Sequence, residues 1–266
     1  MAFYEPDILF QEVEKHLNKL DIKHKPDYLT FVANGEPTLD INLGKEIQLL
    51  KKIHIPIAVI TNSSLLYHKA VQNELMDADW ISVKIDSVEE NTWKEVNNPY
   101  DSINLEKILN GLQKFAENYK GRLNTETMLV KGYNNSEKKL TKTASFIGSL
   151  KPEKVYLSIP IRPPAVVEIK PVTEENLNKA YQIFQKTGLN TELLTGFEGT
   201  DTGVTGNAFD DILNITAVHP LREDAIKELI GKDNADFSVI DTLIDQGVIK
   251  SLDYNGMKYY IRRYHF

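Results

Sequence analysis

Three short polar segments each follow an apolar stretch of the sequence, and their residue types suit the binding of a small polar ligand. They are Asn34-Gly35-Glu36-Pro37 after residues 28–32, Thr61-Asn62-Ser63 after residues 55–60, and Asp86-Ser87 after residues 80–85. Gly35 permits a bend with bare backbone, Glu36 adds a carboxylate and Pro37 fixes the exit of the chain. Such a turn can accept hydrogen bonds from an ammonium group, and its residues equally fit an ordinary turn.

Helical and extended patterns alternate along the chain before residue 195. Apolar residues at helical spacing predict helices over 6–20 and near residues 43–50, 71–75, 105–115 and 140–147, with another capped by Thr173. Buried strands are predicted at 28–32, 55–60, 80–85, 123–130 and 154–159, with a last one near Thr191. This alternation predicts an α/β fold of parallel strands joined by helical crossovers. Ligands of such sheets gather at the carboxyl ends of the strands, where the polar segments lie.

A Gly/Thr-rich stretch, residues 195–207, is predicted to be a loop and a domain boundary. It lacks the Lys-Ser/Thr ending of a phosphate-binding P-loop. Beyond it, helices are predicted at 222–230 and 238–245, followed by a hairpin of 248–252 with 258–263 across Asn255-Gly256. We therefore predict a domain over 1–207 and a small winged-helix-like domain over 208–266.

The second helix of that small domain carries Asp241 and Asp245 and has neither Lys nor Arg. A helix that reads DNA needs cationic and base-reading side chains, so the residues favour a protein contact or a structural role. The formal charge of −7 across 266 residues gives no support to nucleic-acid binding in general.

Composition narrows the class of protein further. The hydrophobic fraction of 41% is enough for a substantial core. No apolar run approaches the roughly 20 residues that span a bilayer, and the N-terminal stretch is not signal-like, which predicts a cytoplasmic protein. The six histidines show no metal-binding spacing, and no Gly-x-Ser-x-Gly elbow accompanies Ser63-Ser64. We therefore predict no metal site and no hydrolase site in this chain.

Taken together and in order, the segments resemble the radical-SAM superfamily. Asn34-Gly35-Glu36-Pro37 resembles its Gly-Gly-Glu-Pro segment, Thr61-Asn62-Ser63 its Thr-Asn-Gly segment, and Lys84-Ile85-Asp86-Ser87 its Ser-Leu-Asp-Ser segment. Residues 97–99, 126–134 and 159–165 resemble later strand ends, the last of them in a branch of Fe–S oxidoreductases related to the archaeal wyosine-tRNA synthesis enzymes. The likeness runs from Tyr4 to Ala165 and, more loosely, to the C-terminus.

The resemblance implies a partial, TIM-like barrel of the (β/α)6 type and S-adenosylmethionine (SAM) as the cofactor. The ammonium group of SAM would lie at Asn34, Gly35, Glu36 and Pro37, mainly on backbone atoms, with Asn62 and Ser63 nearby. Asp86 and Ser87, or Asn124 and Glu126, would bind the ribose hydroxyls, and Arg162 would bind an anionic group of the substrate.

Each of these side chains also has a structural interpretation. Asp86 fits a cap on the next turn, and Glu126 fits an ion pair with Lys84 on a neighbouring strand. Arg162, followed by two prolines, fits a residue that ties down a loop.

Radical-SAM enzymes hold a 4Fe–4S cluster on a Cys-x3-Cys-x2-Cys loop after the first barrel strand, and the cluster cleaves SAM to a 5′-deoxyadenosyl radical. This chain has no cysteine, so the resemblance implies that it holds no cluster and has no catalytic residue of its own. The simplest interpretation is a chain that starts downstream of the first strand and its cysteines, so that only the full-length parent carries the cluster.

Two function classes follow from this interpretation. One is an inactive fragment of a radical-SAM oxidoreductase of unknown substrate, with tRNA or another nucleobase as a direction given by the branch. The other is a non-catalytic scaffold or regulatory protein that keeps the barrel. Without a first strand, residues 28–32 would form an exposed edge, which predicts self-association.

Overall fold

The computed structural model describes residues 1–20, 26–32, 35–164, 166, 168–195 and 204–263. Two compact units make up the chain. The first comprises Met1–Phe10, Pro26–Ile161 and Glu168–Thr195, and the second comprises Gln11–Lys25, Arg162–Val167 and Gly196–Phe266. The first helix, α1 (Pro6–Leu17), is divided between the units: its residues up to Phe10 belong to the first, and those from Gln11 onward belong to the second.

A six-stranded parallel sheet forms the centre of the first unit. Its strands follow one another in sequence order: β1 (Leu29–Phe31), β2 (Ile57–Thr61), β3 (Trp80–Lys84), β4 (Arg122–Met128), β5 (Lys154–Ser158) and β6 (Thr191–Leu194). Each strand pairs parallel with the next. The predicted α/β fold, with the TIM-like barrel strands of the resemblance, is therefore confirmed.

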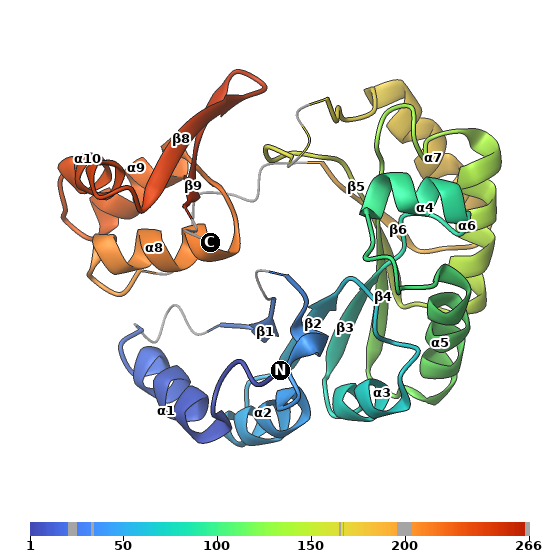
Figure 1. Ribbon diagram of the computed structural model, residues 1–266, viewed down its shortest axis with the longest axis horizontal. Helices are drawn as coiled ribbons and strands as arrows, with labels where there is room; N and C mark the ends of the chain where they lie inside the picture. Colours follow the sequence, from blue (N-terminus) through green and yellow to red (C-terminus); the bar gives the residue numbers. More distant parts are fainter. Residues whose placement is uncertain (21–25, 33–34, 165, 167, 196–203, 264–266) are drawn as a thin grey trace. The chain divides into compact units, whose positions relative to one another are not determined.

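Helices connect these strands and cover the outer side of the sheet (Figure 1). They are α2 (Leu43–Leu50), α3 (Lys69–Leu75), α4 (Glu90–Asn97), α5 (Leu105–Asn118), α6 (Glu137–Ser149) and α7 (Glu174–Lys186). Short 3-10 turns precede and follow α2, namely η2 (Pro37–Leu39) and η3 (Lys51–Ile53). None of the helices in the described ranges is both long enough and apolar enough to cross a membrane.

The two faces of the sheet differ in chemistry because side chains alternate along each strand. One face packs on the helices and is apolar; its fully buried residues include Ile57, Val59, Ile81, Val83, Val155 and Leu157. The helices bury Leu112, Phe115, Ile147 and Phe184. On the other face, register places Lys84, Glu126, Tyr156 and Glu192 in one row across β3, β4, β5 and β6. The polar face therefore carries the charged and hydroxyl-bearing side chains that could bind a ligand.

The second unit has its own core and its own small sheet. Along the chain it contains α8 (Ala208–Val218), β7 (Leu221–Arg222), α9 (Glu223–Lys232), α10 (Ser238–Asp245), β8 (Ile249–Tyr254) and β9 (Met257–Arg262). Its strands pair antiparallel in the order β7-β9-β8. Its core includes Ile212, Ile226, Leu229, Ile240, Leu243 and Ile249.

The hairpin of β8 and β9 turns at Asn255-Gly256, as predicted. Both residues have positive φ, 49° and 74°, which is the backbone of a two-residue hairpin turn that matches strand twist. The predicted helix over 238–245 coincides with α10. The predicted loop over 195–207 falls largely on residues 196–203, which lie outside the described residues.

Candidate functional site

The turn after β1 begins with Gly35, whose φ of 137° lies in the region that favours glycine. Pro37 opens η2 at a position where its missing N–H costs nothing. Glu36 precedes the turn as its N-cap, and its side chain accepts the N–H of Thr38 at 3.0 Å. Asn34, the other predicted residue of this turn, lies outside the described residues.

The Glu36 carboxylate joins this turn to the loop after β2. It is 4% exposed and accepts four hydrogen bonds. Two come from the Thr38 N–H and hydroxyl, at 3.0 and 2.6 Å, one from the Thr61 hydroxyl at 2.7 Å, and one from the Asn62 N–H at 2.7 Å. Because both carboxylate oxygens already accept hydrogen bonds within the protein, the bare Gly35–Glu36 backbone is the part of the turn best placed to meet a ligand.

The loop after β2 brings Asn62 and Ser63 next to this turn. Asn62 is exposed, and its Oδ1 accepts a hydrogen bond from the Ser64 N–H at 2.9 Å. Ser63 is buried and adopts a φ of 69°, a left-handed conformation in which glycine has no steric penalty. Its N–H donates to the Thr61 hydroxyl at 3.0 Å, and its own hydroxyl donates to the Lys84 carbonyl at 3.2 Å.

A charged cluster lies where β3 and β4 end. The Lys84 ammonium is 3.7 Å from the carboxylates of both Asp86 and Glu126. Burial opposes the charge of Lys84, but the two carboxylates outweigh it and raise the pKa of this lysine above its ordinary value. The ion pair between Glu126 and Lys84, the structural alternative from the sequence, is therefore present. Ser158 on β5 also donates to Glu126 Oε1, at 2.8 Å.

Asp86 and Ser87 have partners within the protein. The Asp86 side chain accepts the Met128 N–H and the Asn97 side-chain amide, both at 2.7 Å. Ser87 accepts the Glu89 N–H at 3.0 Å, just before α4. Through these hydrogen bonds, Asp86 and Ser87 stabilise the loops at the strand ends.

Asn134 is a strand-end residue that the sequence did not single out as a site residue. It is 2% exposed, and its side-chain amide donates to the carbonyls of Asp86 and Met128 at 2.9 and 2.8 Å. Its Oδ1 accepts the Val130 N–H at 2.8 Å. One side chain thus joins the ends of β3 and β4. The signal in the sequence was its place in a polar turn after a strand, where Asn commonly bonds nearby backbone.

The remaining predicted residues lie apart from these contacts. Asn124 on β4 is 1% exposed, and its amide lies 3.4 Å from the Arg122 carbonyl. Arg162 belongs to the second compact unit, whereas the strand ends belong to the first.

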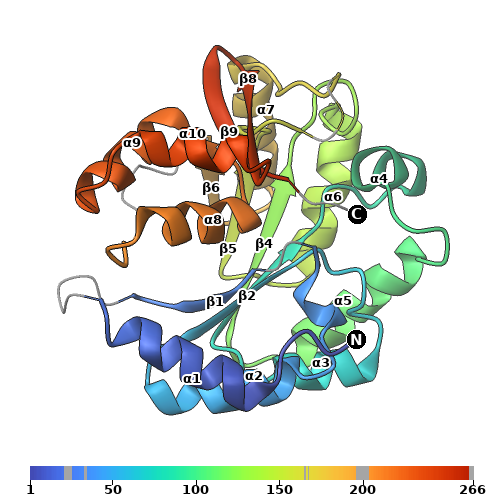
Figure 2. The ribbon, with the colours of Figure 1, turned by 60° about the vertical axis from the view of Figure 1, so that its left-hand side comes forward.

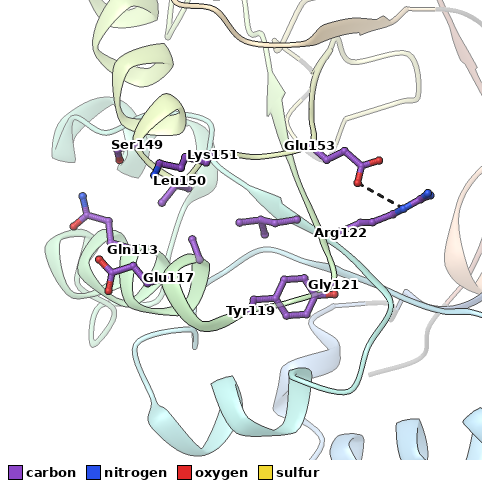
Figure 3. A pocket seen from close by; sticks show the side chains of 11 residues that line it. Gln113, Glu117, Tyr119, Gly121, Arg122, Ser149, Leu150, Lys151 and Glu153 are labelled. Carbon is purple, nitrogen blue, oxygen red and sulfur yellow. Dashed lines mark ion pairs between the residues drawn. The ribbon is translucent and has the colours of Figure 1, made fainter.

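A cavity of 710 Å³ lies in the first unit near Arg122, where β4 begins, far along the strand from Met128, where it ends. Figure 3 shows its lining, including the ion pair of Arg122 with Glu153 at 3.6 Å. The Tyr119 hydroxyl donates to the Ala78 carbonyl at 2.8 Å and is already satisfied. The cavity therefore coincides with none of the predicted ligand residues.

The side chains of this chain limit which metal ions or clusters it can hold. Within the described ranges, no group of three or more His, Asp or Glu side chains is arranged to hold a metal ion. A 4Fe–4S cluster is held by cysteine thiolates, and the sequence contains none. The residues of this chain therefore do not fit a cluster.

Comparison with known proteins gives the family. The radical SAM superfamily matches residues 3–144. A UPF0026 protein of Methanocaldococcus jannaschii is 45% identical over 262 residues, which are 98% of this chain and 81% of that protein. Among solved structures, a domain of a pyruvate-formate lyase-activating enzyme from Bacteroides vulgatus has a TM-score of 0.50 at 24% identity, covering 62% of this chain and 97% of that one. Archaeal TYW1 has a TM-score of 0.52 at 17% identity, covering 70% and 65%, so these two structures are similar in fold. The chain, with its Glu36 turn and its parallel strands, belongs to the radical SAM superfamily.

Proposed function

We propose that this chain binds SAM at the carboxyl ends of β1 to β4 and, by itself, does not cleave it. The occupied carboxylate of Glu36 is the observation that carries this proposal. With all four hydrogen bonds directed into the protein, Glu36 holds its own backbone and that of Asn62 in place. Preorganised backbone carbonyls are suitable acceptors for the ammonium group of SAM.

Glu126 is the residue that we propose for the ribose hydroxyls. Its side chain is 28% exposed on the polar face of the sheet, and its Oε1 contacts Lys84 and accepts the Ser158 hydroxyl. A carboxylate can accept two neighbouring hydroxyl donors. We assign Asp86, which is buried and bonded to Met128 and Asn97, to holding the loop and not to touching the ribose.

Radical chemistry in the family requires a cluster that supplies an electron to SAM, and a cluster requires thiolates. No cysteine is present here, so we derive no cleavage step for this chain. Anaerobic treatment with iron and sulfide should produce no visible cluster absorption and no 5′-deoxyadenosine. Formation of either would contradict the proposal that this chain does not cleave SAM.

Two fragments of SAM give a test that separates the ends of the site. Isothermal titration calorimetry would measure the binding of SAM, of methionine and of adenosine. Gly35→Ala places a side chain at a φ of 137°, although no atom of the described residues lies within 4 Å of the added Cβ. It should weaken the binding of methionine and SAM but spare that of adenosine. Glu126→Gln should weaken adenosine and SAM by about tenfold, the worth of one charged hydrogen bond, but spare methionine.

A matched control is Glu192→Gln, which removes a carboxylate two strands further along the same row. It should leave all three affinities unchanged. The proposal fails if SAM does not bind in the millimolar range, or if Gly35→Ala and Glu126→Gln weaken all three compounds equally.

A tRNA or nucleobase substrate is a further proposal, which rests on the resemblance to one branch of the superfamily and on the shared fold with TYW1. The net charge of −7 lends it no support. A filter-binding assay with bulk tRNA tests it, since saturable binding at physiological salt would favour tRNA and its absence would favour a small molecule.

The absence of cysteine favours a second candidate function, a scaffold or regulatory protein. We propose that residues 208–266 form a winged-helix-like domain with a protein partner, since its α8-α9-α10 helices precede a hairpin. In α10, Asp241 and Asp245 are exposed and no cation is present. Fluorescence anisotropy with duplex DNA at low salt should show no saturable binding, and saturable binding would overturn the protein-contact role.

Self-association is the last part of the proposal. Strand β1 is at one edge of the sheet and pairs with β2 on one side. A free strand edge can pair with a second chain. Light scattering should show a mass that rises with concentration, whereas a monomer at every concentration, with β1 protected from hydrogen exchange, would contradict this.

A further inference from the structure

A buried carboxyl group on α2 lies outside the strand-end residues described above. Glu46 is 2% exposed, and its Oε1 has no hydrogen-bond partner among the described residues. Its charged neighbour is Asp40, which is 3% exposed and follows η2 directly. Burial, and then the Asp40 charge, raise the pKa of Glu46 to about 7. This side chain therefore changes its charge near neutral pH.

Asp40 connects three parts of the chain. Its Oδ2 accepts the Phe3 N–H at 3.1 Å, and its Oδ1 accepts the Asn42 N–H at 2.8 Å just before α2. Its own N–H donates to the Pro37 carbonyl at 3.0 Å and closes η2. One residue thus holds the N-terminal segment 1–4, the start of α2 and the turn that follows Glu36.

Further backbone contacts hold segment 1–4 against the same stretch. The Ile41 N–H donates to the Met1 carbonyl at 3.0 Å, and the Asn42 side-chain amide donates to the Tyr4 carbonyl at 3.1 Å. Met1, Tyr4 and Ile41 are each more than half exposed. The segment is therefore held by a few hydrogen bonds and little apolar burial, which makes it sensitive to the loss of one anchor.

The charged groups around Glu46 are mainly acidic. From α3, which lies beside α2 in Figures 1 and 2, Glu74 faces the same region, and burial and Asp40 raise the pKa of Glu74 as well. The Met1 ammonium bonds the Leu39 carbonyl at 3.2 Å on the exposed side. Lys45 is exposed, and Lys51 donates to the Asp77 carbonyl at 2.8 Å. Ionisation of Glu46 would therefore place a second buried negative charge beside Asp40.

We propose that Glu46 is a proton-operated latch for segment 1–4 and the turn η2. When Glu46 carries its proton, Asp40 is the charged member of the pair and holds the Phe3 N–H. When Glu46 loses its proton, repulsion between the two buried carboxylates favours an opened state in which water reaches both. Segment 1–4 then leaves Asp40, and η2 loses part of its support.

The direction of the pH dependence follows from the two states. The pKa of Glu46 is raised from 4.5 to about 7 in the closed state, so the closed state binds this proton more tightly than an opened, solvated state does. Closure is therefore most favourable at acidic pH and weakens as the pH rises from 4.5 through about 7.

Amide hydrogen exchange of Phe3 tests the latch without any ligand. The quantity measured is the protection factor, which is the intrinsic exchange rate at each pH divided by the observed rate. Between about pH 5.5 and about pH 8, Phe3 protection should fall by about tenfold or more, since one pKa unit corresponds to a factor of ten. In Glu46→Gln, which cannot ionise, protection should stay constant across this range. Glu106→Gln, an exposed position in the first turn of α5, is the matched control and should behave as the unaltered chain.

Two further measurements protect the test from a variant that folds poorly. The Cδ chemical shift of Glu46 in the unaltered chain should titrate near pH 7. Asp40→Asn, which removes the charged neighbour, should move that midpoint to lower pH. The latch is overturned if Phe3 protection does not depend on pH in the unaltered chain, if it depends on pH equally in Glu46→Gln, or if the Glu46 shift titrates near its ordinary value.

Discussion

The two ends of β4 differ in how their polar groups are held. At its carboxyl end and at the neighbouring strand ends of the sheet, Glu36, Asp86 and Asn134 are each at most 4% exposed and each bonds to more than one segment. At its amino end, a 710 Å³ cavity has an ion pair of Arg122 with Glu153, whose side chains are 59% and 54% exposed. The cavity at the amino end is thus lined by exposed polar side chains, whereas the polar side chains at the carboxyl ends are buried and bonded.

This difference teaches that volume alone is a poor guide to the site. An exposed ion pair contributes about 0–1 kcal/mol, because water screens it and two long side chains must be fixed. A buried carboxylate that accepts several hydrogen bonds is costly to disturb, since its donors lose a partner away from water. The ordered network at the carboxyl ends identifies the candidate ligand site.

The largest expected effect comes from Glu36→Gln. A glutamine side chain keeps one acceptor oxygen but presents an NH2 group to donors such as the Thr38 and Asn62 N–H groups. We expect the free energy of unfolding to fall by about 2–4 kcal/mol, measured by urea denaturation. Glu153→Gln is the control at the other end and should cost under about 1 kcal/mol. Equal losses in the two variants would break the contrast between the ends.

A smaller effect is expected from Gly121→Ala at the amino end. An added Cβ would lie 2.3 Å from the Tyr119 hydroxyl and 2.9 Å from the Ala78 carbonyl, which that hydroxyl bonds. Overpacking of this kind costs about 1–3 kcal/mol, yet SAM affinity should stay within about twofold. Gly148→Ala, where the part of the chain that the structure describes has no atom within 4 Å of the new Cβ, should raise stability slightly by favouring helix α6. A loss of SAM binding in Gly121→Ala would mean that the two ends are coupled.

The smallest effect is expected at Ser63. Glycine relieves the positive φ of 69° but removes the hydrogen bond to the Lys84 carbonyl, and each term is about 1 kcal/mol. Ser63→Gly should therefore have nearly unchanged stability. Ser63→Ala keeps the strain and loses the bond, so it should unfold about 1 kcal/mol more easily than Ser63→Gly, as seen by thermal unfolding. The reverse order would show that the backbone here is not strained.

Much of the fold was predictable because the signals were local. Apolar runs marked the six strands, and Asn255-Gly256 marked the hairpin through its positive φ angles. Helix α8 was missed, although Asn207 caps it, because β-branched residues such as Ile215 and Thr216 weaken its helical signal. Helix α4 was missed because it is short and buries only Thr92 and Trp93.

The candidate site was predictable in place but not in detail. Strand ends meet at one edge of a parallel sheet, so the grouping of Glu36, Asn62 and Asp86 followed from topology. The Glu36 carboxylate accepts a hydrogen bond from Thr61, 25 residues away, and this contact depends on the packing of two loops. The latch at Glu46 was equally hidden, because its neighbour Asp40 belongs to a turn whose course no local pattern predicts.

Asn134 has a consequence for how the protein opens. Its single amide holds the Asp86 and Met128 carbonyls and the Val130 N–H at once. Freeing either strand end therefore exposes the polar groups of the other, so both should exchange their amide hydrogens as one cooperative unit with one opening free energy. A molecule that binds only the loop after β3 would then also slow the local opening of the loop after β4, with which it makes no contact.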